Sequence, residues 1–446
     1  MQTRFSTEQL ADPRIAEAEK IIRKCVHCGF CTATCPTYVT LGNELDSPRG
    51  RIYLIKDMLE NGRAADAEVA LHVDRCLSCL ACTTTCPSGV DYMHLIDQAR
   101  VHVEETYRRP LADRFIRALL ARVLPYPGRF RLAVRMATLA RPFSGLFSRI
   151  AGLKPLSAML ALAPQALPRR LDQPKNGLFP AQTARRGRVA VLAGCAQSVL
   201  DPEINRSAIA LLTRLGIDVV MPRGEGCCGA LTHHMGREEE AKAHARRIID
   251  GWMAEIEGEG LDAIVITTSG CGTVIKDYGH LFRDDPAYGE KAARVAALAR
   301  DVTEYLATLE LPDLKANGVS VAYHAACSLQ HGQKITLQPK ALLRKAGFAV
   351  REPAEGHLCC GSAGTYNILQ PEIASRLRDR KADNIRATKA QIIAAGNIGC
   401  MTQLAGALDV PILHTVQLLD WAYGGEHPSF LNEKSIMLKP VEVPAT

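Results

Sequence analysis

The sequence is poor in aromatic residues and contains no long apolar run. Aromatic side chains make up 5% of its 446 residues, and Trp252 and Trp421 are the only tryptophans, so the base-stacking surfaces of single-strand nucleic-acid binders are not expected. No apolar stretch of about 18 residues is free of charge, which predicts no membrane-spanning helix. Because residues 1–10 are polar, no secretory signal peptide is expected. These absences favour a cytoplasmic protein that does not bind nucleic acid.

A glycine fingerprint for dinucleotides is also absent. No G-x-G-x-x-G motif follows an expected strand, and no flavin site is recognisable, so we expect substrate oxidation to take place on another chain. The remaining composition is that of an ordinary globular protein, with 47% hydrophobic and 23% charged residues and a net charge of +7. A chain of 446 residues is too long for one compact domain, and two or three are expected.

Cysteine, in contrast, is abundant, with 16 copies. Disulfides form in oxidising compartments and concentrate in small secreted domains. This chain is large and contains adjacent Cys-Cys pairs. That pattern favours thiolates that bind metal in a reducing cytosol.

Two cysteine runs in the first hundred residues have the spacing C-x2-C-x2-C-x3-C-P. They comprise Cys25, Cys28, Cys31 and Cys35, and Cys76, Cys79, Cys82 and Cys86. Three cysteines at this spacing let one short loop bind three corners of an iron–sulfur cube, and the fourth cysteine binds the other cluster. We therefore predict two [4Fe–4S] clusters, the first held by Cys25, Cys28, Cys31 and Cys86, the second by Cys76, Cys79, Cys82 and Cys35. A pair of zinc sites is the alternative, but zinc usually takes C-x2-C pairs.

The stretch between and after these runs predicts helices. Residues 51–59 have helical spacing, so we expect a helical variant of the ferredoxin-type domain. Residues 111–185 form a basic linker in which no acidic residue lies between Asp113 and Asp172. Arginines alternate there with leucine and phenylalanine, and prolines interrupt the pattern. Such basic amphipathic helices can lie on an anionic membrane surface; packing on a partner subunit or on the chain's own body is the alternative.

The other eight cysteines form two sets of identical order. In each set, a cysteine is followed 32 positions later by Cys-Cys-Gly, and a fourth cysteine follows. The sets are Cys195, Cys227, Cys228 and Cys271, and Cys327, Cys359, Cys360 and Cys400. A spacing that recurs in this way indicates a duplicated structural unit.

Strand and helix patterns alternate in the same way around both sets. Strands are expected at 188–193, 217–221, 263–267, 319–323, 348–351 and 391–395, and helices at 204–215, at 237–256, near Ala341 and from Pro371. Alternation of this kind predicts parallel α/β units, whose ligands bind beyond the carboxyl ends of the strands. We expect the four cysteines of each set to converge there as further iron–sulfur ligands. Zinc, a redox dithiol pair or inert thiols are the alternatives, and His324 could be a ligand, a donor to sulfur or a packed core residue.

The predicted fold is thus an α+β multidomain protein. A helical ferredoxin-type domain at 1–110 and the linker at 111–185 precede a duplicated α/β CCG domain with parallel strands. The two copies are expected at 186–310 and 311–425, with a tail at 426–446.

Several motifs resemble the iron–sulfur subunit of glycolate oxidase (glycolate dehydrogenase). They are LGNELDSPRGR at 41–51, CVHCGFCTATCP from Cys25, SGCG from Ser269 and HLCCGSAGTY from His357, together with the CCG repeat. The resemblance implies a complex in which flavin (FAD) subunits oxidise glycolate, or D-lactate. This chain would then be a non-flavin electron-transfer subunit that passes electrons to a quinone or another acceptor, with peripheral contact to the cytoplasmic face of the inner membrane.

Subunits of anaerobic glycerol-3-phosphate dehydrogenase and heterodisulfide reductase share the CCG pattern and give the alternative functions. In heterodisulfide reductase the motif ends in C-x-x-C, and the extra thiolates help to hold non-cubane clusters. Here Val274 and Gln403 stand three positions after the last cysteines of the two sets. This departure argues against a non-cubane cluster and against a disulfide reductase.

Overall fold

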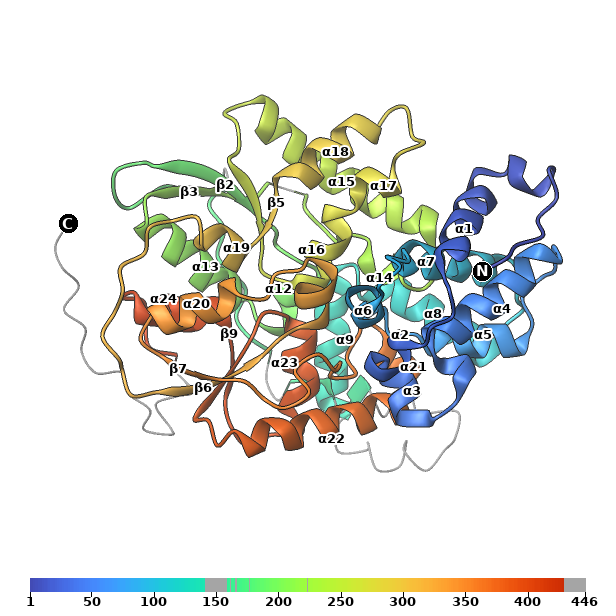
Figure 1. Cartoon of the computed structure of the whole chain (residues 1–446). Coiled ribbons are helices and arrows are strands. Elements are labelled where there is room, and N and C mark those ends of the chain that lie inside the picture. The colour runs from blue at the N-terminus through green and yellow to red at the C-terminus, as the bar shows by residue number, and fades with distance from the viewer. Residues whose placement is uncertain (141–158, 161, 165–166, 176, 223, 429–446) are drawn as a thin grey trace.

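The computed structural model describes residues 1–140, 159–160, 162–164, 167–175, 177–222 and 224–428. The expected tail at 426–446 therefore lies almost wholly outside the described residues, as does the middle of the expected linker. Within the described ranges, no helix is both long and apolar enough to cross a membrane. Helices form one end of the molecule, and two sheets with their covering helices form the other (Figure 1).

Residues 1–110, called the head below, fold into short helices without a strand among the described residues. They are α1 (Pro13–Lys24), α2 (Phe30–Thr34), α3 (Pro36–Leu41), α4 (Pro48–Glu60), α5 (Ala67–Asp74), α6 (Ala81–Thr85) and α7 (Tyr92–Thr106). Proline occupies the first position of α1, α3 and α4, where its missing N–H has no helical partner to lose. The helix expected at 51–59 lies within α4, so the helical ferredoxin-type variant is confirmed.

Two helices of the basic stretch follow the head, α8 (Leu111–Val123) and α9 (Pro127–Ala140). Arg109 and Arg117 both donate hydrogen bonds to the Asp74 carboxylate, at 3.1 and 2.9 Å. These ion pairs fix α8 against the end of α5. Pro125 and Pro127 separate the two helices, because proline cannot continue a helical hydrogen-bond ladder.

Two sheets of matching topology make up the rest of the chain. Their strands are β1 (Leu178–Phe179), β2 (Gly187–Val191), β3 (Ile217–Val220), β4 (Ala263–Ile266) and β5 (Ala299–Asp301), then β6 (Ser320–His324), β7 (Ala349–Arg351), β8 (Ile392–Ala395) and β9 (Ile412–His414). The orders are β1-β3-β2-β4-β5 and β7-β6-β8-β9, and every pair is parallel except β1 with β3. Apart from β1, the strands correspond one to one. The duplicated parallel α/β unit predicted from the sequence is confirmed.

Helices cover both faces of each sheet. The first copy contains α12 (Gln197–Leu200), α13 (Glu203–Arg214), α14 (Ala230–His233), α15 (Glu238–Glu257), α16 (Ser269–Lys276), α17 (Tyr278–Leu281), α18 (Gly289–Leu298) and α19 (Val302–Leu306). The second contains the short π-helix η5 (Ser328–Gly332), α20 (Gln338–Lys345), α21 (Tyr366–Leu369), α22 (Pro371–Ala387), α23 (Ile398–Ala405) and α24 (Thr415–Ala422). In Figure 1, α13, α19, α20 and α24 lie between the sheets, whereas α15 and α18 lie above and α22 below.

The helices between the sheets make the two copies share one hydrophobic core. A single buried cluster contains Val191 of β2, Leu212 of α13, Val321 of β6 and Trp421 of α24. The opposite faces of the sheets pack separately, the first against α15, α16 and α18 and the second against α22 and α23. The carboxyl ends of the parallel strands meet the head, which places the cysteine sets of both copies near it.

Candidate iron–sulfur sites

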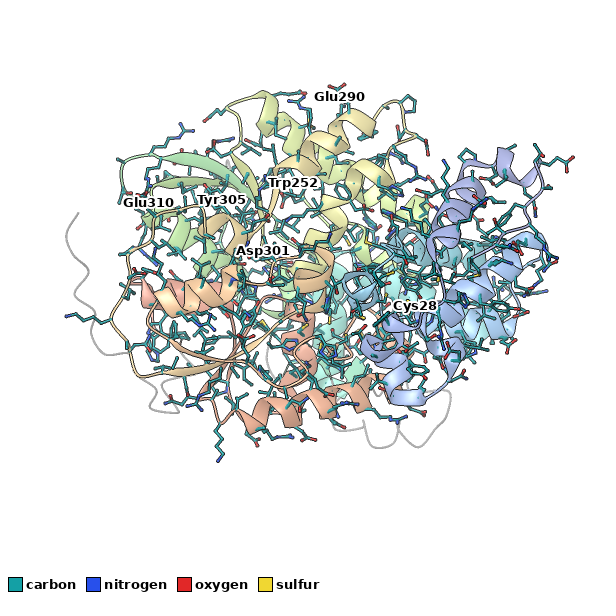
Figure 2. The ribbon with its side chains drawn as sticks, viewed as in Figure 1. Cys28, Trp252, Glu290, Asp301, Tyr305 and Glu310 are labelled. Carbon is teal, nitrogen blue, oxygen red and sulfur yellow. The ribbon has the colours of Figure 1, made fainter. Side chains whose placement is uncertain are left out.

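One cavity of the head is lined by the four cysteines expected to hold the first cluster, called the first head set below. They are Cys25, Cys28, Cys31 and Cys86, and Cys82 also reaches this cavity. The loop after α1 turns sharply, since His27 and Gly29 have φ values of 56° and 86°. Cys28 is exposed, so the cavity lies at the surface of the head (Figure 2).

A second cavity is lined by the second head set: Cys35, Cys76, Cys79 and Cys82. Because Cys82 lines both cavities, the two head sets lie side by side. The loop before α6 turns at Ser78 and Leu80, whose φ values are 47° and 60°. Burial raises the pKa of the Cys79 and Cys82 thiols well above the ordinary value. Such thiols stay protonated unless a metal displaces the proton.

Polar groups approach the sulfur atoms of the second head set. The Tyr92 hydroxyl donates to Cys76 Sγ at 3.7 Å, and a 3.2 Å hydrogen bond joins Thr37 Oγ1 and Cys35 Sγ. Arg51 Nη1 lies 4.0 Å from the same Cys35 sulfur. Hydrogen bonds and positive charge near the sulfurs stabilise an anionic cluster and tune its potential. Four thiols with such donors fit an iron–sulfur cluster.

The motif at 41–51 explains how Arg51 is held in the core. Its side chain is 1% exposed and donates to the His72 carbonyl at 2.6 Å and to Thr37 Oγ1 at 3.1 Å. The buried Asp46 carboxylate lies 3.6 Å from Arg51, 2.8 Å from His72 Nδ1 and 2.9 Å from Arg75 Nη1. Although burial opposes its charge, the surrounding acidic groups keep the pKa of Arg51 above the ordinary value.

The first copy of the repeat brings its four cysteines together, and we call them the N-terminal CCG set. The thiols of Cys195 and Cys227, of Cys227 and Cys228, and of Cys228 and Cys271 lie close enough to shift one another's pKa. The Gly229 amide donates to Cys227 Sγ at 3.4 Å. Hydrogen bonds from Cys195 and Cys228 lower the pKa of Cys227.

The second copy repeats this geometry in the C-terminal CCG set. The thiols of Cys327 and Cys359, of Cys359 and Cys360, and of Cys360 and Cys400 likewise lie close enough to shift one another's pKa. The Gly361 amide donates to Cys359 Sγ, again at 3.4 Å. Gly361 has a φ of 86°, and a Cβ there would lie 2.4 Å from the Ala374 carbonyl oxygen. The backbone that presents adjacent cysteines therefore requires glycine at this position.

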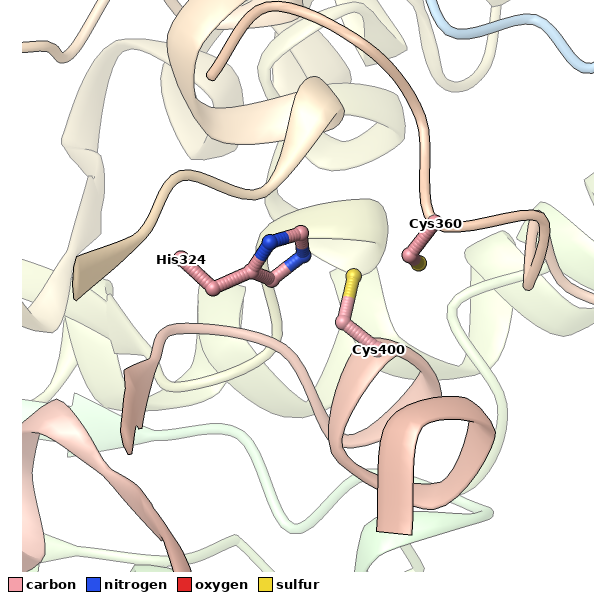
Figure 3. A group of neighbouring side chains, drawn as sticks. All are labelled: His324, Cys360 and Cys400. Atoms are coloured by element: carbon pink, nitrogen blue, oxygen red, sulfur yellow. The ribbon is translucent and has the colours of Figure 1, made fainter. Parts of the chain in front are cut away.

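His324 joins the C-terminal CCG set. One of its ring nitrogens and the sulfurs of Cys360 and Cys400 lie within 4.8 Å of one another (Figure 3). Its Nε2 is buried without a hydrogen-bond partner in the described structure. Burial, reinforced by the charge of Lys381, lowers the pKa of His324 to about 3. A neutral imidazole with a free buried nitrogen is suited to bind a metal.

The head contacts both copies of the repeat. Cys79 and Leu77 pack into the hydrophobic cluster that contains Cys327 and Cys359, while Thr84 Oγ1 lies 2.8 Å from His331 Nδ1. These contacts join the second head set to the C-terminal CCG set.

Contacts with the first copy of the repeat are polar. His94 Nε2 lies 3.1 Å from Asp277, and His233 Nε2 lies 3.2 Å from Asp97. Burial opposes the charge of His94, but hydrogen bonds that its ring donates to the Asp277 and Asp91 carboxylates raise its pKa to about 10.

No local sequence pattern marks the charged residues beside the thiols. Arg51 and Lys381 lie in helical patterns whose charged positions usually face solvent, and the contact between Cys79 and Cys327 joins segments far apart in the chain. For Arg51, the available signal was its place directly before the apolar run Ile52–Ile55.

Residues 21–90 match the family described as a 4Fe-4S dicluster domain, and residues 189–276 and 321–405 match the cysteine-rich domain called CCG. The chain is therefore an iron–sulfur protein with a dicluster head and a duplicated CCG domain. The prediction of two [4Fe–4S] clusters is confirmed at this level.

Individual relatives narrow the class. The "Glycolate oxidase iron-sulfur subunit" of Escherichia coli (strain K12) is 41% identical over 423 residues, which cover 95% of this chain and 99% of the relative. The "Probable glycolate oxidase iron-sulfur subunit" of Bacillus subtilis (strain 168) is 32% identical over 88% of this chain and 89% of the relative. "Lactate utilization protein A" of Bacillus licheniformis is 27% identical over 52% of this chain and 99% of the relative. The chain belongs to the family of glycolate oxidase iron–sulfur subunits, as its motifs predicted.

Proposed function

We propose that this chain is the electron-transfer subunit of a glycolate-oxidising complex. Flavin (FAD) subunits would oxidise glycolate, and this chain would pass the electrons to a quinone or another acceptor. The observation that carries the proposal is that Cys82 lines both head cavities, so two one-electron sites lie side by side. Adjacent sites of this kind suit a relay from a two-electron flavin. The E. coli relative, named as the iron–sulfur subunit of glycolate oxidase, supports the choice of substrate.

The ligands that we propose follow the sets defined above. The first head set (Cys25, Cys28, Cys31 and Cys86) and the second (Cys35, Cys76, Cys79 and Cys82) would each hold one [4Fe–4S] cluster. The N-terminal and C-terminal CCG sets are the candidate ligand sets for further iron–sulfur centres, of which the chain would hold one or two. Their thiol contacts support this proposal, since each set offers four sulfurs at one place.

The bound clusters supply one-electron redox chemistry, and the protein controls their surroundings. Arg51 offsets the negative charge of the second head set, and Tyr92 and Thr37 donate or share hydrogen bonds with its sulfurs. Exposure of Cys28 places the first head set where a partner subunit can approach. Three cysteines of the second head set, Cys35, Cys76 and Cys82, are buried, which favours passage of electrons from the first set inward.

The test is reconstitution with the flavin subunits and measurement of glycolate-dependent reduction of a quinone analogue. We expect Cys28→Ala to abolish acceptor reduction while the flavin is still reduced by glycolate. Ser88→Ala, which changes a neighbour in the same cavity without removing a sulfur, should retain activity. The proposal is wrong if Cys28→Ala reduces the acceptor at the wild-type rate. Running the assay with D-lactate as well decides the substrate.

We also propose that α8 and α9 contact an anionic membrane surface. Leu111, Phe115 and Leu119 form a stripe along α8 and are 79%, 69% and 40% exposed. Leu132, Met136 and Leu139 form a second stripe along α9 and are 59%, 63% and 79% exposed. The exposed arginines Arg114, Arg122, Arg129 and Arg135 flank these stripes. Apolar side chains beside arginine are the features that bind a helix to anionic lipid.

A disulfide reductase is the second candidate, and the structure favours it less. Gln403 stands where heterodisulfide reductase has an additional cysteine, and it accepts a hydrogen bond from Asn367 at 3.0 Å. The corresponding position in the first copy is the buried Val274. Disulfide reduction by the purified chain with an artificial electron donor would support this alternative.

A further inference from the structure

The two CCG sets have the same sulfur geometry but different surroundings. Three positions before the first cysteine stands Leu192 in the first copy and His324 in the second. The carbonyls of Ala241 and Ala374 face the glycines of the two pairs, and seven positions after them stand Ile248 in the first copy and Lys381 in the second. All four side chains are buried. A metal donor and a cation in the second copy thus replace two hydrocarbon side chains.

Lys381 supplies positive charge to the C-terminal CCG set. It is 1% exposed, donates to the Glu355 carbonyl at 2.6 Å, and acts electrostatically on Cys327, Cys359 and Cys360. Burying a negatively charged group in a protein interior costs free energy unless a cation lies close to it. An iron–sulfur centre held by four thiolates carries such a charge. The C-terminal CCG set is therefore equipped to hold one.

The N-terminal CCG set has a partly buried acid nearby instead. Glu225 accepts hydrogen bonds from Trp252 Nε1 at 2.6 Å and from the Ala193 amide at 2.9 Å. The basic group that acts on this set is His244, an imidazole whose ring packs edge-on to Tyr126 at 5.6 Å. No lysine or arginine occupies the place that Lys381 has in the second copy.

In the part of the chain that the structure describes, the C-terminal CCG set is the one that packs with a cysteine of the head. Cys79 of the second head set packs in one hydrophobic cluster with Cys327 and Cys359. The first copy contacts the head through the polar pairs of His94 with Asp277 and His233 with Asp97. Within the described residues, the sulfur-to-sulfur route from the head therefore leads into the second copy.

We propose that the C-terminal CCG set, with His324 as a further donor and Lys381 as its counter-charge, is the third cluster site and is coupled to the second head set across the Cys79–Cys327 contact. The N-terminal CCG set holds no cluster. This inference rests on the proposed function for the direction of electron flow. One electron crosses per event, so the head side is oxidised and the C-terminal side is reduced, without transfer of a proton or a bond.

The first test counts iron and sulfide in the full-length chain after anaerobic reconstitution. We expect about twelve irons per chain in the wild type, about eight in Cys327→Ala and about twelve in Cys195→Ala. About eight irons in the wild type, or about sixteen, would overturn the proposal. So would loss of iron in Cys195→Ala alone. None of these counts depends on glycolate oxidation, so failure of the proposed function and failure of this inference are distinguishable.

The second test is a redox titration followed by EPR, and it addresses His324 and Lys381. We expect Lys381→Met to lower the midpoint potential of the third signal by at least 59 mV, which is a tenfold change in the one-electron equilibrium. We expect His324→Leu, which installs the residue of the first copy, to change the line shape of that signal. Lys242→Met on α15 is the control and should change neither. If both variants keep the wild-type third signal and potential while the head signals are intact, the proposal is wrong.

Discussion

Replacing Arg51 with methionine removes a buried guanidinium from the centre of the head. The change deletes hydrogen bonds to the His72 carbonyl and to Thr37, and it leaves the buried Asp46 carboxylate with His72 and Arg75 as its remaining partners. Removing one partner from a buried ion pair costs about 3–5 kcal/mol. We expect Arg51→Met to lower the stability of the head by about that amount.

The assay follows loss of the EPR signals of the two head clusters during anaerobic guanidinium denaturation. Both tryptophans lie in the repeat, so their fluorescence reports separately on that part of the chain. Arg49→Met is the matched control, because Arg49 lies two positions away, is partly exposed and pairs with Glu44 at the surface. A surface pair of this kind contributes about 0–1 kcal/mol. The reasoning is refuted if Arg51→Met and Arg49→Met destabilise the head equally.

Three further predictions concern other parts of the chain. His94→Ala should destabilise the protein at neutral pH but not above about pH 10. The pKa of His94 in the folded protein is about 10, above the ordinary 6.5, so its stabilising effect is complete below pH 6.5 and is lost as pH rises through 10. Thermal unfolding of both proteins at two pH values measures this. Gly361→Ala should cost about 2–4 kcal/mol, because its Cβ would meet a carbonyl oxygen at a positive φ, and denaturant unfolding measures this cost. Phe115→Asp should weaken co-sedimentation with vesicles containing phosphatidylglycerol about tenfold or more, through loss of apolar burial.

Each of these predictions has a control. His102→Ala, in the same helix, should change the stability of the protein equally at both pH values, because the His102 ring hydrogen-bonds to the Arg63 carbonyl. Gly356→Ala should be tolerated, because its Cβ would have only an ordinary contact at 3.7 Å. Vesicles of phosphatidylcholine alone should bind neither the wild type nor Phe115→Asp. Equal binding of both proteins to anionic vesicles would remove the membrane role of α8.

The sequence predicted those parts of the fold that depend on local patterns. The buried strands β4 and β8 are continuous runs of four apolar residues, and such short runs predict buried strands. Because the cysteines follow such strands, their convergence in each copy was predictable as well. The strands β1, β5 and β9 were not predicted. β5 and β9 have three residues each and run directly into α19 and α24, so no turn pattern separates strand from helix there.

Long-range contacts and buried charges of the candidate sites were not predictable in this way. Lys381 lies on α22, a helix with many charged residues, and nothing in its spacing marks it as the one that is 1% exposed. The contact of Cys79 with Cys327 depends on how the head docks, which no local pattern encodes. For His324, the sequence left three roles open, and the unpartnered Nε2 favours that of a ligand.

The hydrophobic core shared by the two copies has a consequence for biosynthesis. The face of the first sheet that carries α13 is completed only by α20 and α24 of the second copy. During translation, the 116 residues from 307 to 422 must follow α19 before that face can be covered. At about 5–20 residues per second this takes about 6–23 s. For this interval a largely apolar surface is exposed on the nascent chain. Ribosome-associated chaperones are therefore expected to bind the first copy until α24 emerges.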